Sequence, residues 1–202
     1  RCPVDDGRRC EPHGVRDHRP AGRRSRVGRI PCACCNRHVA TLSRFPIIKR
    51  RHLNLTVGWH KRRNALYTRL QLPQGFGPLH LFNWHLGLSA GERAKQSQRL
   101  LHTGTLRDLR LADRVILGGD SNDWRNLLYL NAGIQEAGFH AWSEHGRRQA
   151  ILTFPADAPI GALDKFFWRG PFFHEHLHVS RLELARIASD HRPIIAEFDA
   201  AP

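Results

Sequence analysis

Short apolar runs of strand length, separated by turn residues, dominate the chain from Val39 onward. Such runs, or an alternation of apolar and polar residues, are typical of β-strands. Several runs are apolar on both faces, which indicates strands buried within a sheet. The expected strands are Val39–Leu42, Ala65–Leu72, Leu79–His85, Arg114–Gly118, Lys165–Arg169 and Ile194–Phe198.

Two stretches carry helix signals. Ser89 followed three residues later by Glu92 forms a capping box, which predicts a helix running to about Leu111. Asp123 is placed to cap a second helix through Ile134. Strands interspersed with helices predict a layered α+β domain, with sheets covered by helices on their outer faces.

Residues 1–38 have a different composition. They contain ten Arg and five Cys, no Phe, Trp or Tyr, and only four large aliphatic residues. Such a segment cannot bury enough apolar surface to offset the loss of conformational entropy on ordering. We therefore expect a disordered head over 1–38 and one folded domain over 39–202. Because the chain begins with Arg and contains no Met, we also expect it to be a fragment or a processed piece.

All the cysteines lie in this head, at Cys2, Cys10, Cys32, Cys34 and Cys35. A disulfide framework is therefore excluded for the main body. The Cys-x-Cys-Cys run followed by His38 has zinc-binding residue types, but one cluster lacks the paired spacing of a zinc finger. An odd-numbered set of free thiols is the simpler interpretation.

The chain is strongly basic, with 32 Lys and Arg against 18 Asp and Glu and a net charge of +14. This charge favours polyanionic partners: phosphodiesters, nucleic acid or acidic lipid headgroups. No segment approaches the roughly 18 apolar residues of a membrane span, and no signal-peptide core follows the N-terminus. We expect a soluble, cytoplasmic protein, and no stable protein partner is evident.

Candidate chemistry lies where expected strands end. Asp120 and Asn122 follow a buried run and two glycines, so their oxygens can point into one cleft and bind a divalent cation or an attacking water. The alternative is an ordinary Asp/Asn turn. His85 ends another strand, where an imidazole can donate to a phosphoryl or leaving-group oxygen. A lone His at a strand end is also often just a satisfied polar residue.

A third strand-end group combines Asp164 with Asp190 and His191. A carboxylate hydrogen-bonded to an imidazole fixes its tautomer and raises its basicity, as a general base requires. Each residue also fits a turn or a cap. Three such groups at three strand ends are the stronger indication of a site.

The order of these motifs resembles the endonuclease/exonuclease/phosphatase superfamily, which includes deoxyribonuclease I, abasic-site endonucleases, bacterial sphingomyelinases and inositol polyphosphate 5-phosphatases. The motifs are Leu42-Ser43-Arg44-Phe45-Pro46, Asn83-x-His85-Leu86, Gly119-Asp120-Ser121-Asn122-Asp123-Trp124-Arg125, Thr153-Phe154-Pro155, Leu163-Asp164 and Ser189-Asp190-His191. The match extends from about Val39 to Phe198. The resemblance, closest to the small bacterial members, implies a deoxyribonuclease I-like four-layer α/β/β/α sandwich with its active site at one edge of the two sheets.

The same resemblance implies a metal-dependent phosphoesterase acting on DNA, RNA or a phospholipid headgroup. The catalytic residues would be His85, Asp120, Asn122, Asp164 and His191, and the metal ligands Asp120 and Asp190. Asp120 and Asn122 would orient the water and hold the phosphate, while His85 stabilises charge. His191, oriented by Asp164, would be the general base or a phosphate-stabilising partner. Mg²⁺ or Mn²⁺ would suit the oxygen ligands.

Two departures predict an N-terminally incomplete and impaired enzyme. The family's first-strand Asn and metal-binding Glu motifs are absent, and no carboxylate side chain occurs between Asp17 and Glu92. We interpret residues 1–38 as a truncated or out-of-frame stand-in for the missing strands. Ser121 also replaces an aromatic residue of the family motif. The alternatives are a non-catalytic basic protein that binds polyanions and an inactive fragment.

Further polar and aromatic groups leave alternatives open. The run His174-Glu175-His176-Leu177-His178 would place three imidazoles on one strand face if extended, a candidate extra metal site, or else it is a solvated loop. The paired arginines either guide a phosphate backbone or are solvated; they are Arg23-Arg24, Arg50-Arg51, Arg62-Arg63 and Arg147-Arg148. The five tryptophans are expected in the core or at its rim rather than as base-stacking platforms.

Overall fold

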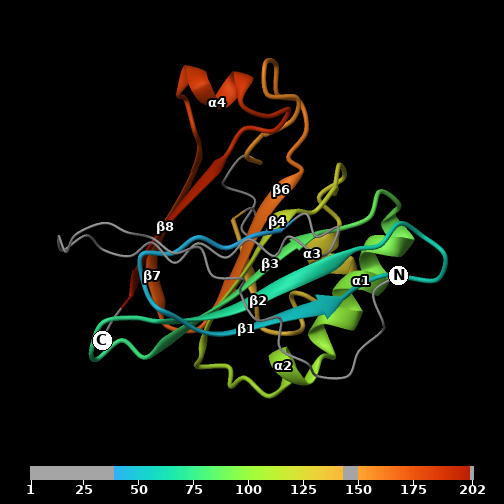
Figure 1. Cartoon of the computed structure of the whole chain (residues 1–202). Helices are drawn as coiled ribbons and strands as arrows, with labels where there is room; N and C mark the ends of the chain where they lie inside the picture. Colours follow the sequence, from blue (N-terminus) through green and yellow to red (C-terminus); the bar gives the residue numbers. More distant parts are fainter. Residues whose placement is uncertain (1–38, 143–149, 201–202) are drawn as a thin grey trace, which may run out of the picture.

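The computed structural model describes residues 39–142 and 150–200. Six strands form one mixed sheet in the order β1-β2-β3-β4-β6-β5, in which only the β3–β4 pair is parallel (Figure 1). The strands are β1 (Ile47–Asn54), β2 (Asn64–Gln71), β3 (Pro78–His85), β4 (Arg114–Asp120), β5 (His140–Ala141) and β6 (Asp164–Arg169). Four of the six strands expected from the sequence therefore form consecutive neighbours at the centre of this sheet.

A second, smaller sheet consists of two antiparallel strands, β7 (Phe172–Val179) and β8 (Ile194–Ala200). The short helix α4 (Glu183–Ile187) connects them and lies at the upper end of this pair in Figure 1. The expected strand Ile194–Phe198 thus belongs to the small sheet.

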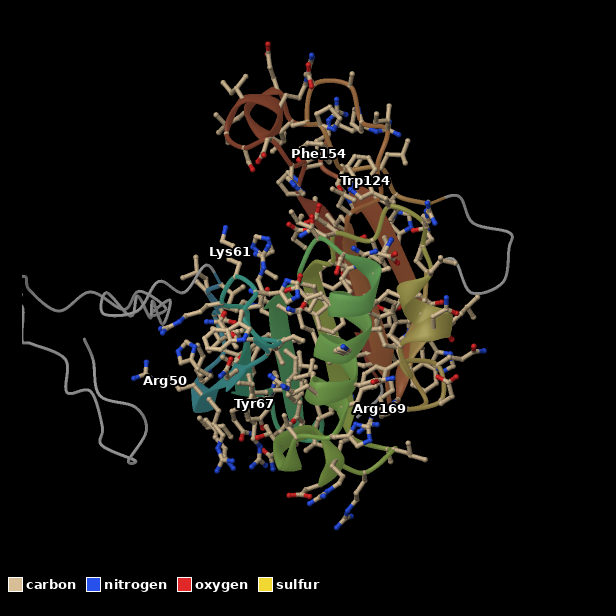
Figure 2. All side chains as sticks on the ribbon, turned by 90° about the vertical axis from the view of Figure 1, so that its right-hand side faces the viewer. Arg50, Lys61, Tyr67, Trp124, Phe154 and Arg169 are labelled. Carbon is tan, nitrogen blue, oxygen red and sulfur yellow. The ribbon has the colours of Figure 1, made fainter. Side chains whose placement is uncertain are left out.

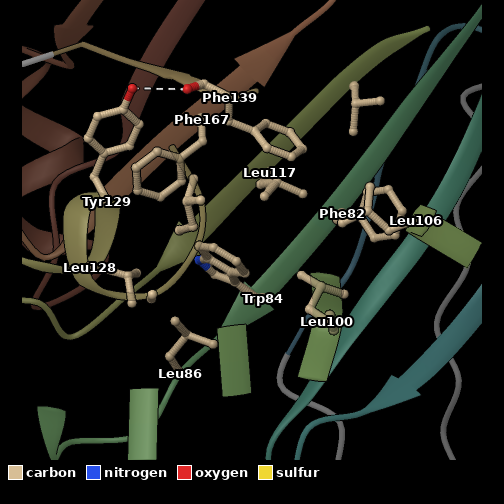
Figure 3. Close-up of a cluster of buried hydrophobic side chains, with 14 of the residues drawn as sticks. Phe82, Trp84, Leu86, Leu100, Leu106, Leu117, Leu128, Tyr129, Phe139 and Phe167 are labelled. Atoms are coloured by element: carbon tan, nitrogen blue, oxygen red, sulfur yellow. Dashed lines mark hydrogen bonds between the residues drawn. The ribbon is translucent and has the colours of Figure 1, made fainter. Parts of the chain in front are cut away.

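One face of the large sheet is covered by helices α1 (Ala90–Leu101), α2 (Gly104–Arg107) and α3 (Leu128–Asn131). The side view of Figure 2 shows α1, in green, lying along this sheet. Between them is the main core, whose largest fully buried side chains include Phe82, Trp84, Phe139 and Phe167 (Figure 3). Burial of these aromatic rings, together with the aliphatic side chains around them, stabilises this half.

A second core lies between the two sheets. It contains Ile116 of β4, Trp168 of β6 and Leu177 of β7, with Phe198 of β8 packed against them at an edge-on ring distance of 5.5 Å from Trp168. The described residues therefore form a helix layer, a large sheet and a small sheet. The expected α+β class is confirmed.

At the N-terminal side, one strand prediction was wrong and one strand was missed. Val39–Leu42 forms no strand, and the chain there contains only an isolated bridge residue at Ser43. The edge strand β1 was missed because Lys49–His52 are all polar and exposed. An edge strand that buries neither face gives no alternation to detect.

The run His174–His178 is not a solvated loop but part of β7. A bulge between Phe173 and His176 shifts the register, so the sequence does not keep one alternation along the strand.

The capping box is confirmed, because the Glu92 N–H donates to Ser89 Oγ at 3.2 Å. The helix ends at Leu101 rather than Leu111, since Thr103 Oγ1 donates to the Leu100 carbonyl and a separate short helix follows. The second helix differs from the prediction, because α3 spans only Leu128–Asn131 and its N-cap is Leu127, although the Leu127 and Leu128 N–H groups donate to the Asp123 carboxylate.

The expected disorder of residues 1–38 and the cysteine cluster lie outside the described residues. Within the described residues, no helix combines the length and apolar character needed to cross a membrane.

Candidate active site

Three of the predicted site residues are neighbours in the register of the large sheet. His85 at the end of β3 pairs with Asp120 at the end of β4, and Asp120 pairs with Asp164 at the start of β6. Because β3 and β4 are parallel and β6 is antiparallel to β4, two strand ends and one strand start meet at the same edge. The topology thus brings together residues that are 79 positions apart from His85 to Asp164.

The fourth segment, which carries His191, is tied to this edge by the Thr153-Phe154-Pro155 loop. The Arg192 N–H donates to the Thr153 carbonyl at 2.8 Å, and the Ala156 N–H donates to the Asp190 carbonyl at 2.8 Å. The Phe154 ring packs against the His191 ring at a centroid distance of 5.0 Å. His191 is therefore fixed from both sides of its own backbone.

The turn after β4 needs its particular residues. Gly119 has a φ of 130°, and a Cβ there would lie 2.1 Å from the Trp84 carbonyl oxygen, so only glycine fits. Asn122 has a φ of 50°, a left-handed conformation that Asn tolerates better than most residues. Its N–H donates to Asp120 Oδ1 at 2.9 Å, and its Nδ2 donates to the Leu86 carbonyl at 3.0 Å. Asp120 and Asn122 therefore have fixed positions.

Two imidazole–carboxylate pairs face one another across the site. His191 Nδ1 and Asp164 Oδ2 are 2.7 Å apart, and His85 Nε2 and Asp120 Oδ2 are 3.2 Å apart. The side chains of Asp164 and His191 are each 22% exposed, so the site is reachable from solvent. With Nδ1 engaged by Asp164, Nε2 is the ring atom of His191 that remains for proton transfer.

Burial raises the pKa of Asp120, and the negative charge of Asp164 raises it further. The Asn122 N–H bond and the charges of His191 and Arg63 act in the opposite direction. For His191, burial lowers the pKa, but the hydrogen bond and charge of Asp164 outweigh burial and the net shift is upward. Perturbed titratable groups of this kind concentrate at functional sites.

Asp120, Asp164 and His191 each offer a ligand atom, and these atoms lie within 4.8 Å of one another. Asp190, predicted as a metal ligand, has an exposed side chain and is not part of this group. Its charge contributes to the raised pKa of His191. The cluster that the fold assembles thus has two carboxylates and one imidazole.

The sequence of this chain was compared with family models and with curated proteins. No family model matches the chain. The chain is 31% identical over 163 residues to the uncharacterized protein YbhP of Escherichia coli K12, and to that of Shigella flexneri, with 79% of this chain aligned. It spans about three fifths of the length of these curated relatives, 61%.

Solved structures resemble the fold over most of its length. The endonuclease/exonuclease/phosphatase of Bacteroides vulgatus has a TM-score of 0.64 at 14% identity, covering 78% of this chain and 67% of that one. The mannosyl-6-phosphatase Bt3783 of Bacteroides thetaiotaomicron has a TM-score of 0.62 at 16% identity, covering 77% and 67%.

The chain has the endonuclease/exonuclease/phosphatase fold. A third structure, TDP2 of D. rerio complexed with single-strand DNA product, has a TM-score of 0.59 at 21% identity, covering 76% of this chain and 68% of that one. The fold that the ordered motifs implied is confirmed by these structures.

Ser121, the residue at which the sequence departs from the motif it resembles, is held by a buried hydrogen bond. Its side chain is fully buried, and Oγ accepts a hydrogen bond from Trp84 Nε1 at 3.1 Å. The indole of Trp84 packs edge-on against Phe167 at 5.9 Å. The substitution therefore leaves a satisfied polar contact rather than an unpaired hydroxyl.

Two cationic residues near the site were not predicted as site residues. Arg63 is buried, its charge lowers the pKa of Asp120, and its Nε and Nη1 have no hydrogen-bond partner among the described residues. Burial lowers the pKa of Lys165, which donates to the Ala162 carbonyl at 2.7 Å. The sequence shows Arg63 only as one of the pair Arg62-Arg63, and no local pattern indicates that Arg63 is the buried one.

The loop of residues 55–63 joins β1 to β2 at the same edge, because Ala65 at the start of β2 pairs with Trp84 near the end of β3. Trp59 in this loop is fully exposed at 105%, contrary to the expected core or rim position. Figure 2 places Lys61 of the loop on the upper half of the molecule with Trp124 and Phe154. The loop with the exposed Trp59 and Lys61 therefore lies at the same end of the large sheet as the candidate site.

Proposed function

We propose that the chain is a phosphoesterase that hydrolyses a phosphodiester with the help of Mg²⁺ or Mn²⁺. The observation that carries this proposal is the group of Asp120, Asp164 and His191, whose ligand atoms lie within 4.8 Å at the end of β4. His85, at 3.2 Å from Asp120, completes the group. Two imidazole–carboxylate pairs around one accessible point suit general acid–base catalysis on a bound phosphate.

His191 is the general base of the proposed reaction. Asp164 holds its Nδ1, so Nε2 accepts the proton of the attacking water and Asp164 stabilises the resulting imidazolium. Asp120 and Asn122 orient the water and hold the phosphate. His85 donates to the oxygen on which negative charge develops.

The residues fit a hard divalent cation. Burial, and to a lesser degree the negative charge of Asp164, raise the pKa of Asp120, and a bound cation would favour its charged form. Asp120 would hold the ion, with Asp190 at the rim, and the bound ion would neutralise charge on the phosphate. Within the described residues this cluster contains no glutamate. Reduced activity of the chain as given, and its cytoplasmic location, stay predictions.

Nucleic acid is the substrate class that the site's surroundings favour over a phospholipid headgroup. Trp59 offers a stacking surface, and Lys61 and Arg62 beside it are exposed cations. The net charge of +14 would attract a phosphate backbone. The TDP2 structure with single-strand DNA product adds an analogy of fold.

The test is hydrolysis of bis(p-nitrophenyl) phosphate and of single-stranded DNA with Mg²⁺, with Mn²⁺ and with excess EDTA. EDTA should abolish turnover. Asp120→Asn and His191→Ala should each lose about a hundredfold or more, the scale of a positioned acid–base group. His52→Ala, an exposed strand histidine in β1, is the matched control and should retain full activity. Full turnover in EDTA would refute the metal, and salt-sensitive DNA binding without turnover would support the non-catalytic alternative.

A further inference from the structure

A second group of metal-ligand side chains lies outside the active site, on the outer face of the small sheet. After the bulge in β7, Leu177 points into the core between the sheets, so its neighbours His176 and His178 point away from it. Glu197 of β8 is the cross-strand partner of His176 and lies on the same outer face. Two imidazoles and a carboxylate from two strands therefore share one surface.

The three side chains are close enough to bind one ion. Each offers a ligand atom, and these atoms lie within 4.8 Å of one another. The rings of His176 and His178 are 5.1 Å apart at their centroids and inclined by 35°. His178 Nδ1 is shielded from solvent and has no hydrogen-bond partner in the part of the chain that the structure describes. A buried ring nitrogen without a partner is uncommon, and a bound metal would satisfy the ring.

We propose that His176, His178 and Glu197 form a second metal site that binds Zn²⁺ in preference to Mg²⁺. Imidazole nitrogen suits zinc, whereas Mg²⁺ prefers an all-oxygen shell. Tetrahedral zinc with Zn–N bonds of about 2.0 Å needs ligand atoms about 3.3 Å apart, which rotation of these exposed or half-exposed side chains achieves. A water completes the tetrahedron, as in other sites with two His and one Glu.

This site shares no residue with the group of Asp120, Asp164 and His191, and its ligand set is the reverse: two imidazoles and one carboxylate. It does not depend on the proposed phosphoesterase function. Its structural consequence is a link between β7 and β8, the two strands of an otherwise marginal two-stranded sheet. The ladder continues from Ser180 N–H to the Pro193 carbonyl at 2.8 Å, two residues from His191. Zinc would therefore stabilise the strand pair that leads into the active site.

The experiment is calorimetric titration of the full-length chain with ZnCl₂ and, separately, with MgCl₂. All five cysteines are replaced by Ser in every variant, because thiolates in the first 35 residues would otherwise compete for zinc. His176→Ala, His178→Ala and Glu197→Gln should each weaken zinc binding by about tenfold or more, since even outer-sphere partners are worth that much. His52→Ala and Asp164→Asn should leave the zinc affinity unchanged.

Two further measurements keep the test independent of variant folding. X-ray absorption at the zinc edge of the cysteine-free chain, with the three proposed ligands intact, should show two imidazole nitrogens, with oxygen as the remaining ligands. Zinc at about a hundredfold excess over its dissociation constant should raise the thermal midpoint by about 5–10 °C, and the same zinc concentration should give about half that rise or less in His176→Ala. Undiminished zinc affinity in a His176→Ala/His178→Ala double variant, or loss of zinc in Asp164→Asn alone, would overturn the proposal.

Discussion

The two sheets of this molecule differ in how deeply their core side chains are buried. The core beneath the helices contains fully buried rings such as Phe82 and Trp84, whereas the core between the sheets has three buried residues, with only partly buried ones around them, within 39–142 and 150–200. In and beside α4, Leu182, Leu184 and Ile187 are 71%, 68% and 78% exposed. The large sheet thus packs against a deeply buried core, and the small sheet packs against a smaller, partly buried one.

This difference divides the candidate site. His85, Asp120 and Asp164 stand on the large sheet, while His191 comes from the segment that leads into β8. The hydrogen bond between His191 and Asp164, at 2.7 Å, therefore links the segment before β8 in the small sheet to β6 in the large sheet. Because the site takes residues from two sheets with unequally buried cores, its geometry depends on hydrogen bonds of this kind.

The largest expected effect is a difference in unfolding free energy between cavity-forming substitutions in the two cores. Phe82→Ala empties a fully buried site in the large-sheet core and should lower the free energy of unfolding by about 3–5 kcal/mol. Phe198→Ala, in the partly buried small-sheet core, should cost only about 1–2 kcal/mol. Urea unfolding followed by circular dichroism measures both. Equal losses would show that the small sheet is as strongly packed as the large one.

The next effect concerns the anchor between the layers. Asp164→Asn removes the charge that orients His191 and raises its pKa, and should lower kcat about a hundredfold while the unfolding midpoint changes little. Asp157→Asn, an exposed carboxylate in the neighbouring loop, is the matched control. An Asp164→Asn variant with normal kcat would mean that His191 needs no orienting partner.

A smaller effect should appear at the edge loop of the large sheet. Trp59→Ala removes an exposed ring and should raise KM for single-stranded DNA about fivefold, the lower end of base stacking. The rate on bis(p-nitrophenyl) phosphate should not change, because that substrate does not reach the loop. Leu111→Ala, 71% exposed just before β4 at the opposite end of the sheet, serves as control. A similar loss on both substrates would place Trp59 in catalysis rather than in substrate binding.

The same difference decides how much of the fold the sequence predicts. β2, β3, β4 and β6 bury their side chains on a large sheet, so their apolar runs mark them closely. Edge strand β1 and bulged strand β7 were missed because exposure and the bulge remove the alternation. Prediction from local pattern succeeds where apolar residues recur along the strand, as they also do in β8, and fails where exposure or a bulge removes that recurrence.

For the site, the motif order predicted which residues meet but not how each is held. The pairing of His191 with Asp164 is confirmed, at 2.7 Å. The metal role of Asp190 stays a prediction, with its side chain exposed beside the cluster. Arg63 was recognised only as one of an arginine pair, because sequence alone does not say which of two adjacent arginines faces inward. Long-range packing makes that choice.

The smallest expected effect is a loss of unfolding free energy at low pH caused by one buried histidine of the large sheet. His80 of β3 is buried, and its Nδ1 is 2.9 Å from the Tyr67 hydroxyl. Burial lowers the pKa of His80 from its ordinary 6.5, against a smaller upward effect of Asp113. Above pH 6.5 the imidazole is neutral in both states, so it adds no pH dependence. As the pH falls below that value, the unfolded chain binds a proton that the folded chain does not, and the free energy of unfolding decreases.

His80→Gln keeps an acceptor for Tyr67 but cannot titrate, so its thermal midpoint should fall less than that of the unchanged chain between about pH 7.5 and about pH 5.5. His52→Ala should behave like the unchanged chain. If His80→Gln loses as much stability on acidification as the unchanged chain, other groups carry the pH dependence and His80 does not.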